Sequence, residues 1–367
     1  MSLSERHVQD APDGARPFDA IAIEGELRNM WSASSSKSSG AIYRAALANL
    51  VVPLDPSLAS RLMPVLIEVT RRHPSRLFPI GAGGASRGAR LEARIGAICH
   101  RRETGGGLVC SEQVILDSDV GSTGLIPSAI RSLVIGDLPT VHLNLHSRFD
   151  LPWISELMDM ADLILVDSCL AAPGAEPEVW RFVGREGSRR VHDLTWARLT
   201  PWRTILAEVF DEKMYLPSLR TVRRVEIGFT GPGNPPPQVW LLAGWLVSRL
   251  GWNVDGGGRD GLVLRSDAGT VTLALQRIGK GEERWLERIH IEAGAPHPLD
   301  VEILHRGRER TARVDVRVPA PSSSDVPFGY CEFAACIVGE IQRHAPNRSM
   351  EEAARAAEDL IQSWRKP

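Results

Sequence analysis

The stretch 49-NLVVPLDPSLASRLMPVLIEVTRRHPSRLFPI-80 decides the fold class. Its first residues, 49–54, form an apolar run typical of a buried strand, and residues 76–80 form a second one. Between them, leucines and a valine recur at helical spacing, and Asp55 with Pro56 favours a helix start as N-cap and first helical residue. Strand, helix and strand with short connections are typical of a right-handed parallel βαβ unit. The stretch therefore predicts a parallel sheet covered by helices.

The same alternation continues downstream. Further strands are predicted at 91–100, 107–117, 140–145 and 162–168, and helices around 128–136 and 151–161. We therefore predict an α/β domain over residues 20–217, with a largely parallel sheet flanked by helices. Residues 1–19 are polar and are predicted to form a disordered tail.

The pattern changes in the second half of the chain. The glycine- and proline-rich run 228–237 marks a turn or linker, and the apolar run 238–252 predicts a buried helix that ends at Gly251. Strands without intervening helices follow at 261–266, 270–278, 286–294, 299–307 and 311–319. Two terminal helices are expected, at 327–343 and after a capping box from Ser349 to Glu352. Residues 218–367 are thus predicted to form an α+β domain with an antiparallel meander.

Composition excludes several classes of protein. The 43 basic and 45 acidic residues give a net charge of −2, which provides no general attraction for nucleic acid or an anionic membrane. No apolar run is long enough to span a bilayer, and the first residues contain no apolar secretory segment. We expect a cytoplasmic protein; its own oligomeric state is unknown from sequence.

The five cysteines contain no C-x-x-C pair. They are Cys99, Cys110, Cys169, Cys331 and Cys336. On one helix, Cys331 and Cys336 would point about 140° apart around the axis. The sequence therefore predicts free, mostly buried thiols and no metal site.

No motif of an enzyme or of a cofactor site survives inspection. The run GAGGASRGA at 81–89 follows a strand, but Ser86 occupies the last glycine position of a dinucleotide fingerprint and a strand, not a helix, follows. We interpret it as a loop. G-x-S-x-G, H-E-x-x-H and a histidine-paired cysteine are all missing from the sequence. No catalytic, cofactor-binding or metal-binding residue is predicted.

Two polar groupings leave alternatives open. His142, Asn144 and His146 alternate with apolar residues, which indicates the polar face of a strand or, with Asp167, a ligand crevice. A second grouping lies where a helix gives way to a strand, and its cations either bind an anion or complement the helix dipole. Its candidate anion-binding residues are Arg72, His73 and Arg76.

The stretch 194-LTWARLTPWRTILAEVFD-211 concentrates aromatic and cationic side chains. Thr200 and Pro201 suit the start of an amphipathic helix, whose buried side begins with Trp202. Trp196 and Arg198 precede that start. Residue type leaves both roles open, since such side chains staple a core or anchor an interface.

This stretch resembles the signature of the glucose-6-phosphate dehydrogenase assembly protein family, OpcA. Six further runs resemble that family in the same order: NLVVPLD, HPSRLFPI, EQVILD, GDLPTV, ADLILVDS and LLAGWLVSRLGW. The resemblance extends from about residue 45 to residue 252. It implies a non-enzymatic protein that associates with glucose-6-phosphate dehydrogenase and favours its active oligomer.

Residue type nominates candidate partner-interface residues within the signature, whereas the face that meets the dehydrogenase is unknown from sequence. The candidate interface residues are Trp196, Arg198, Trp202 and Arg203. One departure from the family follows Asp137-Leu138-Pro139, where a Leu-Trp-Trp type run is usual and this chain has Val141 to Asn144. Two rival functions remain: a sugar-phosphate sensor or enzyme that uses the crevice near His142, Asn144 and Asp167, and a scaffold for another partner.

Overall fold

The computed structural model describes most of the chain. It describes residues 8–9, 15–37, 42–83, 90–101, 107–171, 174–183, 190–258, 261–279, 281–307, 309–343 and 345–365. The chain forms two compact units. Unit 1 comprises Met1–Ala171, Ser188–His192 and Phe333–Ala345, and unit 2 comprises Ala172–Gly187, Asp193–Glu332 and Pro346–Pro367. Each unit is built from three separate stretches of the chain, whereas the sequence predicted a single boundary near residue 217. The predicted domains 20–217 and 218–367 stay a prediction.

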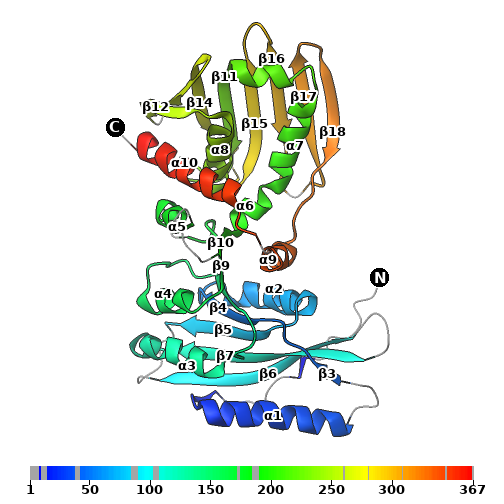
Figure 1. Cartoon of the computed structure of the whole chain (residues 1–367), viewed down its shortest axis with the longest axis vertical. Coiled ribbons are helices and arrows are strands. Elements are labelled where there is room, and N and C mark those ends of the chain that lie inside the picture. The colour runs from blue at the N-terminus through cyan, green and yellow to red at the C-terminus, as the bar shows by residue number, and fades with distance from the viewer. Residues whose placement is uncertain are drawn as a thin grey trace. The chain divides into compact units, whose positions relative to one another are not determined.

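Unit 1 contains a sheet in the order β1-β6-β7-β5-β4-β8-β9-β10, with β2 beside β6 and β3 beside β7 (Figure 1). Its strands are β1 (Val8–Gln9), β2 (Arg16–Pro17), β3 (Ile42–Arg44), β4 (Asn49–Leu54), β5 (Arg76–Ala82), β6 (Leu91–Arg101), β7 (Leu108–Ser118), β8 (Thr140–Asn144), β9 (Leu163–Val166) and β10 (Arg190–Asp193). Strands β7, β5, β4, β8 and β9 run parallel, and β6 is antiparallel to β7. The predicted, largely parallel sheet is confirmed.

Helices cover the central strands of this sheet, and β4, β8 and β9 are buried along their whole length. All six residues of β4 are buried, as expected for a parallel strand covered on both faces. The helices are α1 (Ala20–Lys37), α2 (Ala59–Arg72), α3 (Ile126–Leu133), α4 (Pro152–Asp159) and α9 (Phe333–Ile341), with a 3-10 turn η1 (Val120–Leu125). Helix α2 packs beside α9, and α3 lies beside both α1 and α4.

The chain reverses its direction across this sheet at β4. From β4 the crossover through α2 leads to β5 on one side, whereas β8 lies on the other side of β4. In doubly wound sheets such a topological switch point opens a crevice at the carboxyl ends of the strands. A ligand site in unit 1 is therefore expected first at the carboxyl ends of β4 and β8.

Two local predictions near the N-terminus need correction. Helix α2 begins at Ala59, and Asp55 instead closes a turn in which its Oδ1 accepts a hydrogen bond from Ser57 N at 3.0 Å. Within the predicted tail, Val8–Gln9 and Arg16–Pro17 pair with β6. Residues 1–7 and 10–14 lie outside the described residues, so the rest of the tail stays a prediction.

Unit 2 contains a second sheet, in the order β12-β13-β14-β11-β15-β16-β17-β18. Its strands are β11 (Val222–Phe229), β12 (Asn253–Gly258), β13 (Gly261–Ser266), β14 (Gly269–Arg277), β15 (Leu286–Ala293), β16 (Leu299–Leu304), β17 (Thr311–Val318) and β18 (Ser322–Pro327). The predicted antiparallel meander is confirmed, with one insertion. Strand β11 lies between β14 and β15 and runs parallel to β14. Its buried Val225 and Ile227 alternate with Arg224 and Glu226, a period-two pattern that the sequence prediction missed.

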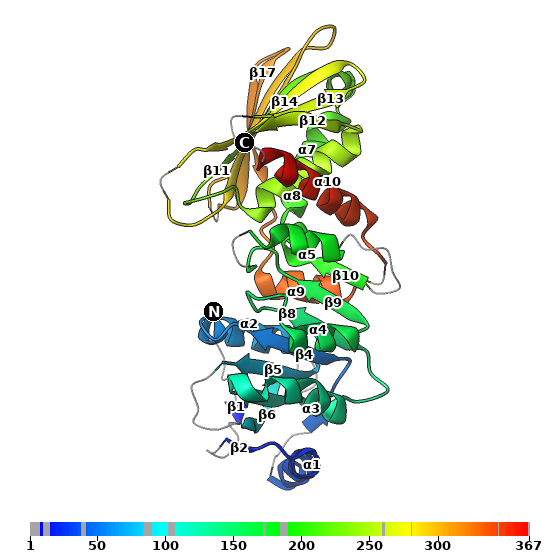
Figure 2. The ribbon, with the colours of Figure 1, turned by 90° about the vertical axis from the view of Figure 1, so that its left-hand side faces the viewer.

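Helices of unit 2 lie on one side of its sheet (Figure 2). They are α5 (Glu176–Val183), α6 (Leu194–Arg198), α7 (Thr200–Asp211), α8 (Pro237–Leu250) and α10 (Arg348–Trp364), with a 3-10 turn η2 (Leu216–Thr221). Helices α8 and α10 pack closely, because a Cβ on Gly244 would lie only 2.2 Å from the carbonyl oxygen of Ala353. Helix α8 ends at Gly251, as predicted, with φ of 65°. Helix α10 is capped by Asn347, whose Oδ1 accepts from Met350 N at 3.2 Å, so the predicted capping box at Ser349 is wrong.

The prediction of free thiols is wrong for four of the five cysteines. Cys99 and Cys110 face each other across β6 and β7, with Cα atoms 4.0 Å apart, and form a disulfide. Cys331 and Cys336 are also disulfide-bonded. The helical-angle argument failed because α9 begins only at Phe333, after Cys331. Among the described residues, Cys169 is the cysteine that forms no disulfide.

Candidate functional site

The family-like signature forms two short consecutive helices of unit 2, α6 and α7. Asp193 caps α6, because its Oδ1 accepts a hydrogen bond from Thr195 N at 2.9 Å. Helix α7 begins at Thr200 itself, and its N-cap position is Leu199, which has no capping side chain. Thr200 is therefore not the N-cap that the sequence predicted, although Pro201 does lie in the first turn.

Both tryptophans of the signature lie inside unit 2. Trp196 is 3% exposed and Trp202 is 4% exposed. The guanidinium of Arg203 lies 3.6 Å from the centre of the Trp196 ring and donates to the Trp196 carbonyl at 2.8 Å. Arg198 donates to Thr195 Oγ1 at 3.2 Å. The half-buried guanidinium of Arg203 thus lies over the buried indole ring of Trp196, and contacts within the signature hold both arginines in position.

Trp202 also forms one wall of a small aromatic pocket in unit 2. Its ring meets Phe328 and His305 edge-on, with centroids 5.5 and 6.0 Å away, and His305 stacks on Phe328 at 3.6 Å. The pocket has a volume of about 50 Å³, and Arg198 and Tyr330 also line it. Tyr330 is 49% exposed. The sequence could not indicate this pocket, because His305, Phe328 and Tyr330 lie far beyond the signature in the chain.

A carboxylate lies at the switch point of unit 1. Asp55 follows β4 and accepts hydrogen bonds from Ser57 Oγ and Ser147 Oγ, each at 2.6 Å. Although partial burial opposes ionisation, the hydrogen bonds from Ser147 and Ser57 lower the pKa of Asp55 to about 2. In dinucleotide-binding folds this position carries a glycine-rich turn for phosphate. A fixed negative charge there disfavours a phosphorylated ligand.

The predicted crevice around His142 is closed. His142 is 0% exposed, and neither ring nitrogen has a hydrogen-bond partner among the described residues. Burial lowers the pKa of His142 to about 3, so its ring is neutral. Asn144 is 4% exposed and Asp167 is 7% exposed, and Asp167 accepts from Cys169 N at 3.1 Å. These three side chains therefore present no open polar site to a solute.

The candidate anion-binding residues do not form one site. Arg76 is 3% exposed, and its guanidinium donates to Glu112 Oε2 at 2.7 Å and to Glu24 Oε1 at 2.5 Å. Arg72 is paired with Glu68 at 2.7 Å. Burial lowers the pKa of His73, which removes its positive charge at neutral pH. The interpretation as an anion site is corrected, because carboxylates already neutralise the two arginines.

Nothing in the described part of the chain adds a cofactor site. Within the glycine-rich run, residues 84–89 lie outside the described residues, and β6 follows the run as a strand, as predicted. The described residues contain no cluster of three or more potential metal ligands. A search of the same residues finds no helix suited to crossing a bilayer. Fold and site together define a class: a doubly wound α/β unit without the phosphate-binding turn, joined to an antiparallel sheet unit.

Comparisons of sequence identify the family. Residues 67–180 match the model of the glucose-6-phosphate dehydrogenase subunit N-terminal domain, and residues 189–354 match that of its C-terminal domain. Together the two models match more than half of the chain, and the chain belongs to the OpcA family of glucose-6-phosphate dehydrogenase assembly proteins.

Relatives share part of their length with this chain. An OxPP cycle protein OpcA from Nostoc punctiforme is 31% identical over 201 residues, covering 50% of this chain and 40% of that protein. Another from Synechocystis sp. is 26% identical over 166 residues, covering 44% of this chain and 34% of that protein. The matches thus span about two fifths or less of these relatives. A solved 3-ketoreductase from Actinomadura kijaniata has a similar fold, with a TM-score of 0.50, 14% identity, and coverage of 87% of this chain and 97% of that one.

Proposed function

We propose that this chain is a non-catalytic partner of glucose-6-phosphate dehydrogenase that favours the active oligomer of that enzyme. The observation that carries the proposal is the match of both family domains, in order, along one chain. The carboxylate of Asp55 at the switch point supports a non-catalytic role, since it disfavours the phosphate of a dinucleotide or sugar phosphate.

The mechanism would be differential affinity. A regulatory partner favours an active conformer only by binding it more tightly than the inactive one. A difference of about 1.4 kcal/mol in binding free energy gives a tenfold shift in that equilibrium. This mechanism requires neither a catalytic step nor a bound cofactor on this chain.

The proposed contact surface is the signature region of unit 2. Arg198 and Arg203 would face the dehydrogenase, while Trp196 and Trp202 would support them from inside. Aromatic and arginine side chains held in place this way are typical of residues that dominate binding energy at interfaces. The exposed Tyr330 beside Arg198 extends this surface.

Titration of the purified chain into its cognate dehydrogenase tests the proposal. NADP reduction and particle mass are followed together, at protein concentrations up to the micromolar range. We expect a rise in rate together with a larger particle. No change in either quantity would contradict an assembly role, and a mass change with a different protein only would favour a scaffold for another partner.

The surface is tested with Arg198→Ala, because this side chain is half-buried and lies outside the core. We expect an about tenfold weaker complex with an unchanged melting temperature, since truncating a well-placed interface arginine costs more than about 1 kcal/mol. Arg61→Ala is the matched control, an exposed arginine on α2 in unit 1. Equal affinities of both variants would remove the signature surface from the interface.

A further inference from the structure

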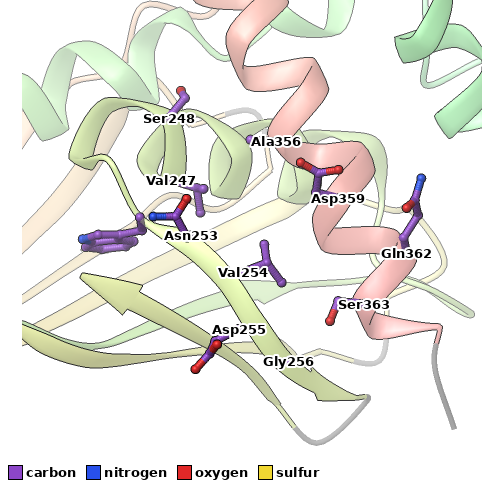
Figure 3. A pocket seen from close by; sticks show the side chains of 11 residues that line it. Val247, Ser248, Asn253, Val254, Asp255, Gly256, Ala356, Asp359, Gln362 and Ser363 are labelled. Carbon is purple, nitrogen blue, oxygen red and sulfur yellow. The ribbon is translucent and has the colours of Figure 1, made fainter. Parts of the chain in front are cut away.

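A polar groove of about 500 Å³ lies in unit 2, away from the signature pocket (Figure 3). Its walls come from the last turn of α8, the strand β12 and the last turns of α10. Ser248, Asn253, Asp359, Gln362 and Ser363 supply hydroxyl, amide and carboxylate groups to it. Its volume falls in the range of small-molecule sites, which is about 300–1,000 Å³.

A buried hydroxyl lines this groove without a protein partner. Ser363 is 5% exposed, and its hydroxyl forms no hydrogen bond with any described residue. Figure 3 shows Ser363 on the side of α10 that faces β12, near Val254. This oxygen keeps some accessible surface in the groove and has no partner among the described residues, so it is available to a ligand there.

The described lining of the groove carries negative charge. Among the described residues that line it, Asp255 and Asp359 supply carboxylates and none is a lysine, arginine or histidine. Helices α8 and α10 both end here, and the carbonyl groups of a last helical turn carry partial negative charge. Burial and then the neighbouring Glu358 raise the pKa of Asp359, which indicates a site where an added positive charge is favourable.

We propose that this groove binds a small organic cation, with an ammonium or guanidinium group beside Asp359 and a hydrogen bond to Ser363. Asp255 contributes less, because its carboxylate is already paired with Arg265 and points away from Val254 in Figure 3. Sugar phosphates and dinucleotides are anions and are repelled by the same groups. The groove therefore recognises a ligand unlike the substrates of a dehydrogenase.

The test uses the full chain and four probes: agmatine, putrescine, neutral glucose and glucose 6-phosphate. Calorimetric titration should detect agmatine or putrescine, with weaker binding as sodium chloride is added because the attraction is electrostatic. Neither sugar should bind. Cation binding that is absent at 10 mM, or matched by glucose, would overturn the proposal.

Variants locate the cation within the groove. Asp359→Asn should weaken agmatine binding about tenfold, because it removes a charge-assisted hydrogen bond, and Ser363→Ala should weaken it by a smaller factor. Asp325→Asn, at an exposed aspartate on β18, is the matched control and should bind as the parent chain does. Unchanged binding by a folded Asp359→Asn variant would contradict this site.

Discussion

A histidine on the sheet of unit 1 and a histidine on the sheet of unit 2 have opposite surroundings. On β8 of unit 1, His142 lies between covered faces, is 0% exposed and has no hydrogen-bond partner among the described residues. On β15 of unit 2, the ring of His290 lies 2.9 Å from Asp300 and within 4 Å of Glu226 and Glu292. The difference follows from coverage, because a parallel sheet carries helices on both faces whereas an antiparallel sheet can leave one face to solvent.

Ion pairs differ in the same way. In unit 1, Arg76 and Glu112 form a buried pair, with side chains 3% and 2% exposed. In unit 2, Arg288 lies near both Glu226 and Glu302, and Arg317 near both Asp300 and Glu302, on the sheet face opposite the helices. Buried charges need specific partners, whereas exposed charges exchange partners with water and salt. The comparison predicts that equivalent substitutions cost much more in unit 1.

The largest effect is expected for Arg76→Met. It leaves Glu112 buried with Trp31 and Arg44 as remaining donors, and it also removes the pair with Glu24. Breaking a buried pair from one side costs about 3–5 kcal/mol. Calorimetric unfolding should show this loss, whereas Arg94→Met, which breaks an exposed pair with Asp117, should change stability by less than about 1 kcal/mol. Both arginines lie in unit 1, so similar losses in the two variants would show that burial does not set the cost of breaking an ion pair.

An intermediate effect is expected for His142→Leu, and it depends on pH. The pKa of His142 is about 3 in the folded chain and 6.5 ordinarily, so below pH 6.5 the unfolded chain binds a proton that the folded chain does not. Stability therefore falls on acidification, by about 2 kcal/mol between pH 6.5 and pH 5. His142→Leu should remove this part of the loss and be at least as stable at pH 7.

Denaturant unfolding at pH 5, 6 and 7 measures the pH dependence. His290→Leu is the matched control, because it makes the same change on the open sheet face. If the parent chain and His142→Leu lose stability in parallel between pH 6.5 and pH 5, the buried histidine is not the origin of the acid sensitivity.

The smallest effect is expected for Arg317→Ala. Its side chain is 49% exposed, and its partners Asp300 and Glu302 keep other nitrogen groups nearby, namely those of His290 and Arg288. Loss of an exposed pair costs about 0–1 kcal/mol and less in high salt. Unfolding in 50 mM and 500 mM sodium chloride should give similar small differences. A loss above about 2 kcal/mol would mean that this face is not screened by solvent.

Much of the fold could be predicted, because the spacing of apolar residues along the chain indicates which side of a strand or helix is buried. The apolar run 49–54 indicated β4, and Gly251 marked the end of α8. Strand β11 was missed because the glycine- and proline-rich run that begins at residue 228 was interpreted as a linker. The Cys99–Cys110 disulfide was missed because only the register of β6 against β7 places the two cysteines opposite each other.

The candidate site was less predictable than the fold. The stretch 194–211 was correctly singled out as family-like, and the predicted burial of Trp202 is confirmed, but residue type did not reveal that Trp196 is buried as well. The same holds for Arg76, whose charge suggested an anion site until Glu112 and Glu24 were placed beside it. Charge and aromaticity are properties of a residue, whereas accessibility depends on the residues packed around it.

The sequence by itself determined the fold class, the order of most elements and the family, because these depend on local periodicity and on short runs that are contiguous in the chain. Only the tertiary structure decided which polar groups meet. Asp55 and Ser147 come together at the switch point, and Trp202 meets His305 and Phe328. Such contacts join residues about a hundred positions apart, and they depend on sheet order and register, which no local pattern specifies.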